Sequence, residues 1–109
     1  MIDLHLHTTA SDGRSTPEQL VTRLIAAGIR ACAITDHDTT AGLAPARAAA
    51  AGTPLTVIAG IEITAVHAEV DVHMLGYFFD PENAELASFL VTQRADRVRR
   101  VLEMLDRLD

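Results

Sequence analysis

Hydrophobic and polar residues alternate at the start of the chain, where aliphatic residues at positions 2, 4 and 6 are separated by Asp3, His5 and His7. A period of two residues is typical of a β-strand with one apolar face. Residues 1–6 therefore predict a strand, with the two histidines together on the face opposite the aliphatic side chains. The following segment, residues 8–15, contains Ser11-Asp12-Gly13 and predicts a loop.

Helical spacing begins after this loop. Thr16 and Pro17 are a typical cap and first helical residue, and Gly28 is a typical stop, so a helix is predicted between them. The alanine-rich segment 40–51 predicts a second helix that begins near Leu43 and is closed by Gly52.

Three further strands and one long helix complete the pattern. Apolar or alternating runs at residues 29–35, 55–63 and 70–79 predict strands, and Asp80-Pro81 interrupts the chain. From residue 84 to 108 the apolar positions recur every three or four residues, which predicts one amphipathic helix. Strands that alternate with helices indicate an α/β protein, with mostly parallel strands joined by crossover helices.

The composition narrows the functional classes. The chain of 109 residues has nine arginines, no lysine and 15 acidic residues, for a net charge of −6. Non-specific coating of DNA needs a surplus of cations, so we exclude it, whereas phosphate handling through metals stays open. No secretory signal or membrane-spanning stretch is recognisable, and the single cysteine, Cys32, cannot form an internal disulfide. A cytoplasmic protein with no membrane partner is the simplest interpretation.

Chemically versatile side chains gather where the predicted strands end. In a parallel α/β sheet the carboxyl ends of all strands open onto one rim, where active sites form. The sequence places His, Asp and Glu on that rim from several segments: His5 and His7, Asp12, Asp36-His37-Asp38, Glu62 and His73.

This residue set suits divalent metal ions. Imidazole and carboxylate together bind Zn, Mn or Fe, and two histidines two residues apart on a strand face the same side. A carboxylate such as Glu62 can bridge two ions, which then clamp a phosphoryl group and lower the pKa of a bound water. Taken singly, each residue has another reading: Asp12 as a turn residue, Asp36 and Asp38 as helix caps, Glu62 as a surface acid and His73 as a core histidine. His67 has no partner spacing, so we expect it to be exposed to solvent.

The motifs resemble the PHP (polymerase and histidinol phosphatase) domain family. Residues 3–8 and Ser11-Asp12-Gly13 look like its first motif, residues 35–38 like its second, and residues 60–62 with Val72-His73 like the third and its partner. Stand-alone bacterial PHP phosphoesterases, including 3′,5′-nucleotide bisphosphate phosphatases, are the most similar branch. The alternatives within the family are histidinol phosphatases and polymerase-associated exonucleases.

The resemblance implies a distorted (β/α)7 barrel with two or three divalent ions at its rim. It implies His5, His7 and Glu62 for the first ion, Glu62 and His73 for the second, and Asp12 and His37 for a third. Metal-bound hydroxide would then attack a phosphate monoester of a nucleotide or short oligonucleotide, with no protein nucleophile. The polar residues next to these ligands are expected to orient the imidazoles without binding metal themselves: Asp3, Thr8, Asp36 and Asp38.

A closed barrel of this kind takes about 250 residues, so we expect residues 1–109 to be the N-terminal part of a PHP domain. Residues 1–80 would supply barrel elements and ligands, and residues 81–109 a helix leading toward a helical insertion. The alternatives are a non-catalytic metal-binding or interaction half-barrel, and a barrel completed by pairing with another chain through the open sheet edge.

Overall fold

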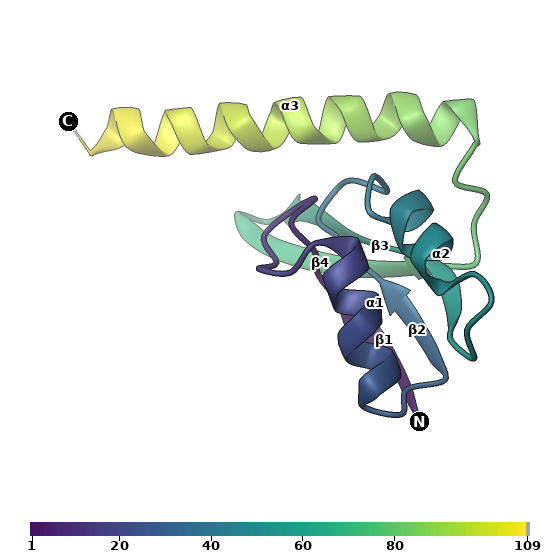
Figure 1. The fold of residues 1–109 in the computed structure, drawn as a ribbon. Helices are drawn as coiled ribbons and strands as arrows, with labels where there is room; N and C mark the ends of the chain where they lie inside the picture. Colours follow the sequence, from purple (N-terminus) through teal and green to yellow (C-terminus); the bar gives the residue numbers. More distant parts are fainter. Residues whose placement is uncertain (109) are drawn as a thin grey trace.

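The computed structural model describes residues 1–108 and contains a four-stranded sheet in the order β1-β2-β3-β4. The strands are β1 (Ile2–Leu6), β2 (Ala31–Ile34), β3 (Thr56–His67) and β4 (Val70–Tyr77). β1, β2 and β3 are parallel, whereas β4 returns antiparallel to β3 as a hairpin (Figure 1). The predicted α/β class with mostly parallel strands is therefore confirmed.

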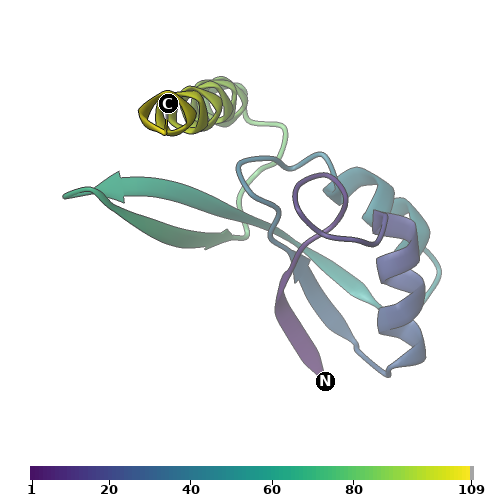
Figure 2. The same cartoon turned by 90° about the vertical axis from the view of Figure 1, so that its left-hand side faces the viewer.

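The two crossover helices lie together on one face of the sheet (Figure 2). α1 (Pro17–Ala26) begins at the predicted cap, where the Thr16 hydroxyl accepts a hydrogen bond from the Gln19 backbone N–H at 3.1 Å. The Gln19 side chain accepts one from the Thr16 N–H at 2.9 Å, which completes a capping box. α2 (Leu43–Ala50) begins at the predicted residue.

The hydrophobic core lies between these helices and the first three strands. Its buried members come from α1, α2, β2 and β3 and the loops that join them: Leu20, Val21, Leu24, Ile29, Cys32, Ile34, Leu43, Ala46, Ala50, Leu55, Val57 and Ala59. This packing fixes β2 and β3 side by side, and so fixes the rim at which their carboxyl ends meet.

β1 is less buried than its alternating pattern predicts. Ile2 and Leu4 are exposed, and only Leu6 packs against the core. The reason is positional, because β1 is an edge strand and α1 and α2 cover only one face of the sheet (Figure 2). The pairing with β2 also shifts register between Asp3 and Leu6, which interrupts the alternation.

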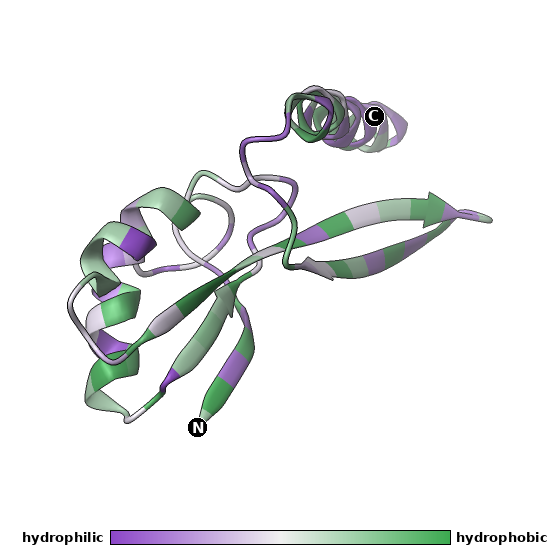
Figure 3. Ribbon diagram, turned by 90° about the vertical axis from the view of Figure 1, so that its right-hand side faces the viewer, coloured by the Kyte–Doolittle hydropathy of each residue, from purple (hydrophilic) through white to green (hydrophobic). Residues whose placement is uncertain are grey.

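β3 is longer than predicted and places Glu62 in its interior instead of at its end. The strand continues to His67 because residues 60–67 pair in register with β4, from Gly60 opposite Tyr77 to His67 opposite Val70. The hairpin extends away from the body of the protein, with apolar and polar residues alternating along it (Figure 3). His67 is exposed, as expected.

α3 (Ala84–Arg107) runs as a single long helix past the rim end of the sheet (Figure 1). Asn83 caps it through a 2.9 Å hydrogen bond from the Leu86 N–H, and Arg99 pairs with Glu103 one turn further along the helix at 3.2 Å. Among residues 1–108, Leu90 is the one α3 side chain that is fully buried, so polar contacts carry much of the attachment. Within residues 1–108, no helix combines the length and the hydropathy that a membrane span requires.

Candidate metal centre

Glu62 is the hub of the histidine cluster at the rim. Its carboxylate is 5% exposed, and the backbone around it is fixed by an isolated parallel bridge between His37 and Glu62. Oε1 lies 2.7 Å from His5 Nε2 and 3.3 Å from His7 Nε2. Oε2 lies 3.0 Å from His73 Nδ1 and 3.4 Å from His37 Nδ1. One carboxylate therefore faces four imidazoles, which come from β1, the loop after β1, the loop after β2, and β4.

Asp12 completes the cluster from the loop after β1. Its two oxygens lie 3.1 Å from His7 Nδ1 and 3.1 Å from His37 Nε2, so it spans the two rings. The adjacent Gly13 lets the loop close tightly, because a Cβ at that position would lie 2.5 Å from the backbone carbonyl group of His7. The Gly13 N–H donates to the Thr8 carbonyl at 2.8 Å, which holds this turn.

The cluster divides into three groups whose possible ligand atoms lie within 4.8 Å of one another. All six residues predicted as ligands take part, and His7, His37 and Glu62 each belong to two groups. The groups are His5-His7-Glu62, His7-Asp12-His37 and His37-Glu62-His73. The first corresponds to the predicted first ligand set, and the other two add His7 or His37 to the predicted pairs.

The donor atoms fit divalent ions better than they fit a purely hydrogen-bonded network. Nδ1 of His7 and Nδ1 of His37 are buried, and neither has a hydrogen-bond partner with acceptable geometry among residues 1–108. A buried polar atom without a partner is costly, and these two point toward carboxylates 3.1 and 3.4 Å away. Imidazole and carboxylate are ligands of Zn, Mn and Fe, so an ion between these atoms would satisfy them.

The electrostatics of the cluster favour ionised carboxylates. Burial raises the pKa of Glu62, but the hydrogen bond with His5 and the positive charges of His37, His7 and His5 outweigh it, and the pKa lies below its ordinary value. Burial also raises the pKa of Asp12, and His37 and His7 again lower it overall. Both groups are held in the charged form that ligates metal.

Two carboxylates that were expected to orient the imidazoles, Asp36 and Asp3, instead accept hydrogen bonds from backbone N–H and hydroxyl groups. Asp36 is 1% exposed and accepts three hydrogen bonds: from the Thr8 N–H at 2.6 Å, the Thr8 hydroxyl at 2.7 Å and the Ser11 hydroxyl at 2.7 Å. Asp3 accepts from the His5 backbone N–H at 3.2 Å. Neither carboxylate bonds to an imidazole in the described structure, so each would position ligands through the chain that carries them.

Asp38 links the loop after β2 to β3. It is 1% exposed, and it accepts a 3.3 Å hydrogen bond from the Thr64 N–H. Its backbone adopts a φ of +54°, a left-handed conformation that Asp tolerates better than most residues. Asp36 and Asp38 were equally open to a capping role from sequence, but α2 is capped at Gly42 without a side-chain hydrogen bond.

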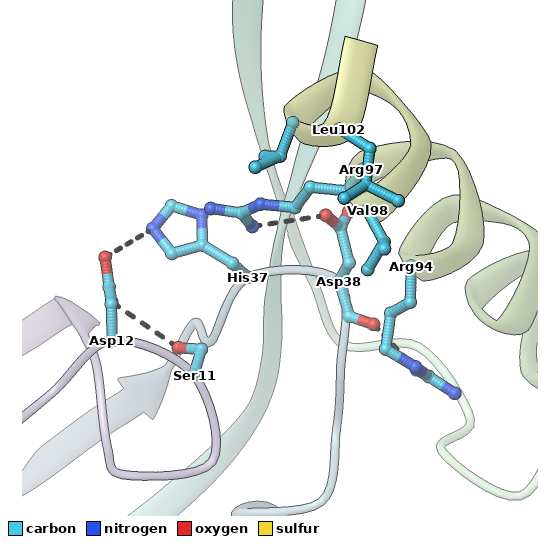
Figure 4. A pocket seen from close by; sticks show the side chains of 9 residues that line it. Ser11, Asp12, His37, Asp38, Arg94, Arg97, Val98 and Leu102 are labelled. Carbon is cyan, nitrogen blue, oxygen red and sulfur yellow. Dashed lines mark hydrogen bonds and ion pairs between the residues drawn. The ribbon is translucent and has the colours of Figure 1, made fainter. Parts of the chain in front are cut away.

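Sequence reasoning missed two arginines that α3 brings to the cluster. Arg94 Nη1 donates to the Asp38 carbonyl at 2.8 Å, and Arg97 Nη1 lies 3.5 Å from Asp38 Oδ2 (Figure 4). The amphipathic pattern predicted the helix but not the surface against which it packs. The available signal was the spacing of these arginines, three residues apart on one face of the predicted helix.

Comparisons with known proteins agree with this arrangement. The sequence profile described as the PHP domain matches residues 3–107. The 5′-3′ exoribonuclease Rnm of Escherichia coli (strain K12) is 42% identical over 109 residues, which cover 98% of this chain and 37% of that protein. The 3′,5′-nucleoside bisphosphate phosphatase of Chromobacterium violaceum is 39% identical, over 94% of this chain and 36% of that protein.

A solved structure from Bifidobacterium adolescentis, described as a candidate metal-dependent phosphoesterase, superposes with a TM-score of 0.86 at 44% identity. That comparison covers 98% of this chain and 37% of the other. The chain thus spans a little over a third of the length of the proteins that it matches.

Proposed function

The chain belongs to the PHP domain family, and from that premise we propose that it acts in a metal-dependent phosphoesterase that hydrolyses phosphate monoesters of nucleotides or short oligonucleotides. The observation that carries the proposal is the cluster of four histidines around the Glu62 carboxylate, extended by Asp12. This cluster supplies nitrogen and oxygen ligands at the rim of a parallel sheet, where active sites of such folds form.

We assign the ligands by the three groups of the cluster. His5, His7 and Glu62 would hold one divalent ion, and His37, Glu62 and His73 a second. His7, Asp12 and His37 would hold a third, with Mn, Zn and Fe all compatible with the donor atoms. Bound divalent ions supply Lewis-acid activation of the phosphoryl group and of the attacking water.

The chain's own residues would prepare the site for this chemistry. Glu62 stays ionised because its pKa is lowered, so it can bridge two positions without losing charge to a proton. Asp36 would keep Asp12 in place by ordering the loop through Thr8 and Ser11. The thiol of Cys32 is fully buried in the core and takes no part.

The chemistry of the relatives supports the substrate class. One named relative acts on RNA and another on nucleoside bisphosphates, and both substrates present phosphoesters of nucleotides. We propose the same class here, in a cytoplasmic protein. Histidinol phosphatase and polymerase-associated exonuclease activities are alternatives, because their families share the ligand motifs.

The test is release of inorganic phosphate from adenosine 3′,5′-bisphosphate with added Mn²⁺. Glu62→Gln keeps the shape of the side chain but removes the charge, and Glu85→Gln is the matched control on an exposed residue of α3. We expect Glu62→Gln to lower the rate at least about tenfold, because metal ligation depends on the carboxylate, and Glu85→Gln to leave it unchanged. Equal rates for the protein and Glu62→Gln would refute the proposal.

The non-catalytic alternative predicts a different outcome of the same experiment. A half-barrel that only binds metal would take up Mn²⁺, Zn²⁺ or Fe²⁺ and release no phosphate with any of them. Self-association is a separate proposal, and it would use the outer edges of β1 or β4, which pair with no further strand among residues 1–108. Sedimentation velocity over a range of concentrations tests it.

A further inference from the structure

A pocket of about 460 Å³ lies between the ligand cluster and α3 (Figure 4). Asp12 and His37 line its cluster side, and Arg97, Val98 and Leu102 line its helix side. We infer that Arg97 is an oxyanion-binding residue that holds the phosphoryl group of the substrate in this pocket. The inference rests on the proposed function and adds a residue that neither the motifs nor the ligand groups include.

The Arg97 guanidinium has hydrogen-bonding capacity to spare. Its polar contact in residues 1–108 is a single ion pair of 3.5 Å with Asp38, and 42% of its side chain is exposed. A guanidinium offers five N–H donors in a planar fork that matches the oxygens of a phosphate. One long ion pair leaves most of these donors free to bind a ligand in the pocket.

The neighbouring arginines of α3 are occupied or directed elsewhere. Arg94 uses Nη1 to bind the Asp38 backbone carbonyl at 2.8 Å. Arg99 pairs with Glu103 at 3.2 Å, and Arg100 lies 3.7 Å from an acidic residue of β4. Arg97 is therefore the pocket arginine whose side chain is both near His37 and incompletely paired (Figure 4).

Asp38 is a rigid tether for this arginine. Its backbone N–H donates to the Glu62 carbonyl at 2.9 Å, and its side chain accepts from the Thr64 N–H at 3.3 Å. Asp38 also follows His37 directly in the chain, so the tether is tied to two residues of the cluster. A guanidinium held in place loses less freedom when a ligand binds, which strengthens the binding.

Charge and shape indicate which end of the substrate lies here. Asp12 and Asp38 are two carboxylates of the pocket that would repel an oxyanion, and Arg97 supplies a compensating cation in the same pocket. Val98 and Leu102 give the same pocket an apolar wall. An oxyanion site beside an apolar wall suits a phosphate monoester of a nucleoside, with the phosphoryl group at Arg97 and the less polar part along α3.

The test uses the 109-residue chain, with inorganic phosphate as the probe and a chelator present, so that binding does not depend on metal. Two-dimensional NMR follows the Nε–Hε signals of the arginines during the titration. We expect the Arg97 signal to shift and saturate, and Arg97→Gln to raise the Kd for phosphate about tenfold because a charge-assisted hydrogen-bonding group is lost. Arg97→Lys should raise it less, and the control Arg99→Gln should leave it within about twofold.

The Leu90 amide signal reports whether α3 stays docked in each variant. If Arg97→Gln undocks the helix, the Arg97 signal of the unaltered chain and the Arg97→Lys variant decide the question. An unchanged Kd in a docked Arg97→Gln variant, an Arg97 signal that does not move, or no binding of phosphate would overturn the inference. A parallel Mn²⁺ titration of the unaltered chain and Glu62→Gln separates the two proposals. If the chain shows no Mn²⁺ binding that depends on Glu62, the proposed function is contradicted. If Mn²⁺ binds in this way but phosphate does not bind at Arg97, only the role of Arg97 is contradicted.

Discussion

Replacing Asp36 by alanine removes the acceptor of three hydrogen bonds that hold the loop after β1. The carboxylate is buried, and it binds the Thr8 N–H, the Thr8 hydroxyl and the Ser11 hydroxyl at 2.6 to 2.7 Å. Thr8 is itself 0% exposed, so its N–H would be left without water as a substitute partner. The loop that leads to Asp12 would then lose its main attachment to the end of β2.

The expected magnitude follows from these contacts. A hydrogen bond to a charged group contributes about 1.5–3 kcal/mol, but three bonds to one carboxylate are not independent. We therefore expect Asp36→Ala to lower the free energy of unfolding by about 3 kcal/mol, in the range of variants that leave a buried donor unsatisfied. Asp36 contacts no imidazole, but it orders the loop that carries Asp12. Asp36→Ala should therefore lower metal affinity about 10- to 100-fold.

Urea unfolding followed by circular dichroism, in the presence of chelator, measures the stability loss without any contribution from metal. Calorimetric titration with Mn²⁺ then measures affinity. Ser11→Ala is the partial control, since it removes one of the three bonds and should cost about 1.5 kcal/mol, the lower end of the range for a charged acceptor. Asp36→Asn keeps one acceptor oxygen and should lie between the control and Asp36→Ala.

An Asp36→Ala variant whose free energy of unfolding lies within about 0.5 kcal/mol of the unaltered protein, the size of an ordinary surface effect, would show that these hydrogen bonds do not hold the loop. A fall in stability with unchanged Mn²⁺ affinity would contradict the second part of the prediction. In that case the hydrogen bonds of Asp36 would stabilise the loop but would not determine where the ligand side chains lie.

Three further predictions concern the loop, the first helix and the core. Gly13→Ala should destabilise the protein by about 1–3 kcal/mol, because its Cβ would meet backbone atoms at 2.5 Å. Gly76→Ala should cost less, because its Cβ would meet only a side-chain atom at 3.4 Å, and urea unfolding compares the two variants. Thr16→Ala should cost about 1 kcal/mol by removing the helix cap, and thermal melts check this against the unaltered chain. Burial, with a smaller contribution from Asp3, raises the pKa of Cys32 from 9.0 to about 11, so folding favours the protonated thiol. The stability that the protonated Cys32 thiol contributes is present below pH 9 and should be lost as the pH rises through about 11. Stability measured from pH 8 to 11 tests the sign, and rapid labelling of native Cys32 by a thiol reagent at pH 8 would contradict its burial.

Local signals predicted those parts of the fold that local interactions determine. Thr16 and Pro17 start α1 as predicted, because the cap and the restricted proline backbone act within one turn. The strand-end rule also predicted where His7, Asp12 and His37 lie, because they follow the parallel strands β1 and β2. Glu62 and His73 reach the same cluster from inside the antiparallel β3–β4 hairpin, which that rule does not cover.

The features that were missed depend on contacts between distant residues. Glu62 lies inside β3 because β4 extends the strand beyond residue 63, and a strand's length after its apolar run depends on its partner. Arg97 reaches Asp38 across 59 positions of sequence, so no window of local pattern reveals the contact. The exposure of Ile2 and Leu4 likewise reflects which sheet face the helices leave uncovered, which alternation alone does not encode.

Metal content shows whether the histidine cluster around Glu62 is a metal centre. It is measured by mass spectrometry for the protein, Glu62→Gln and Glu85→Gln, after dialysis against Mn²⁺ or Zn²⁺ and removal of free ions. Glu62 contacts all four histidines of the cluster, so its charge should be indispensable. We predict at least one ion per chain in the protein and in Glu85→Gln, and a loss of most of it in Glu62→Gln. Equal metal content in all three proteins, or none in any, would contradict the assignment of this cluster as a metal centre.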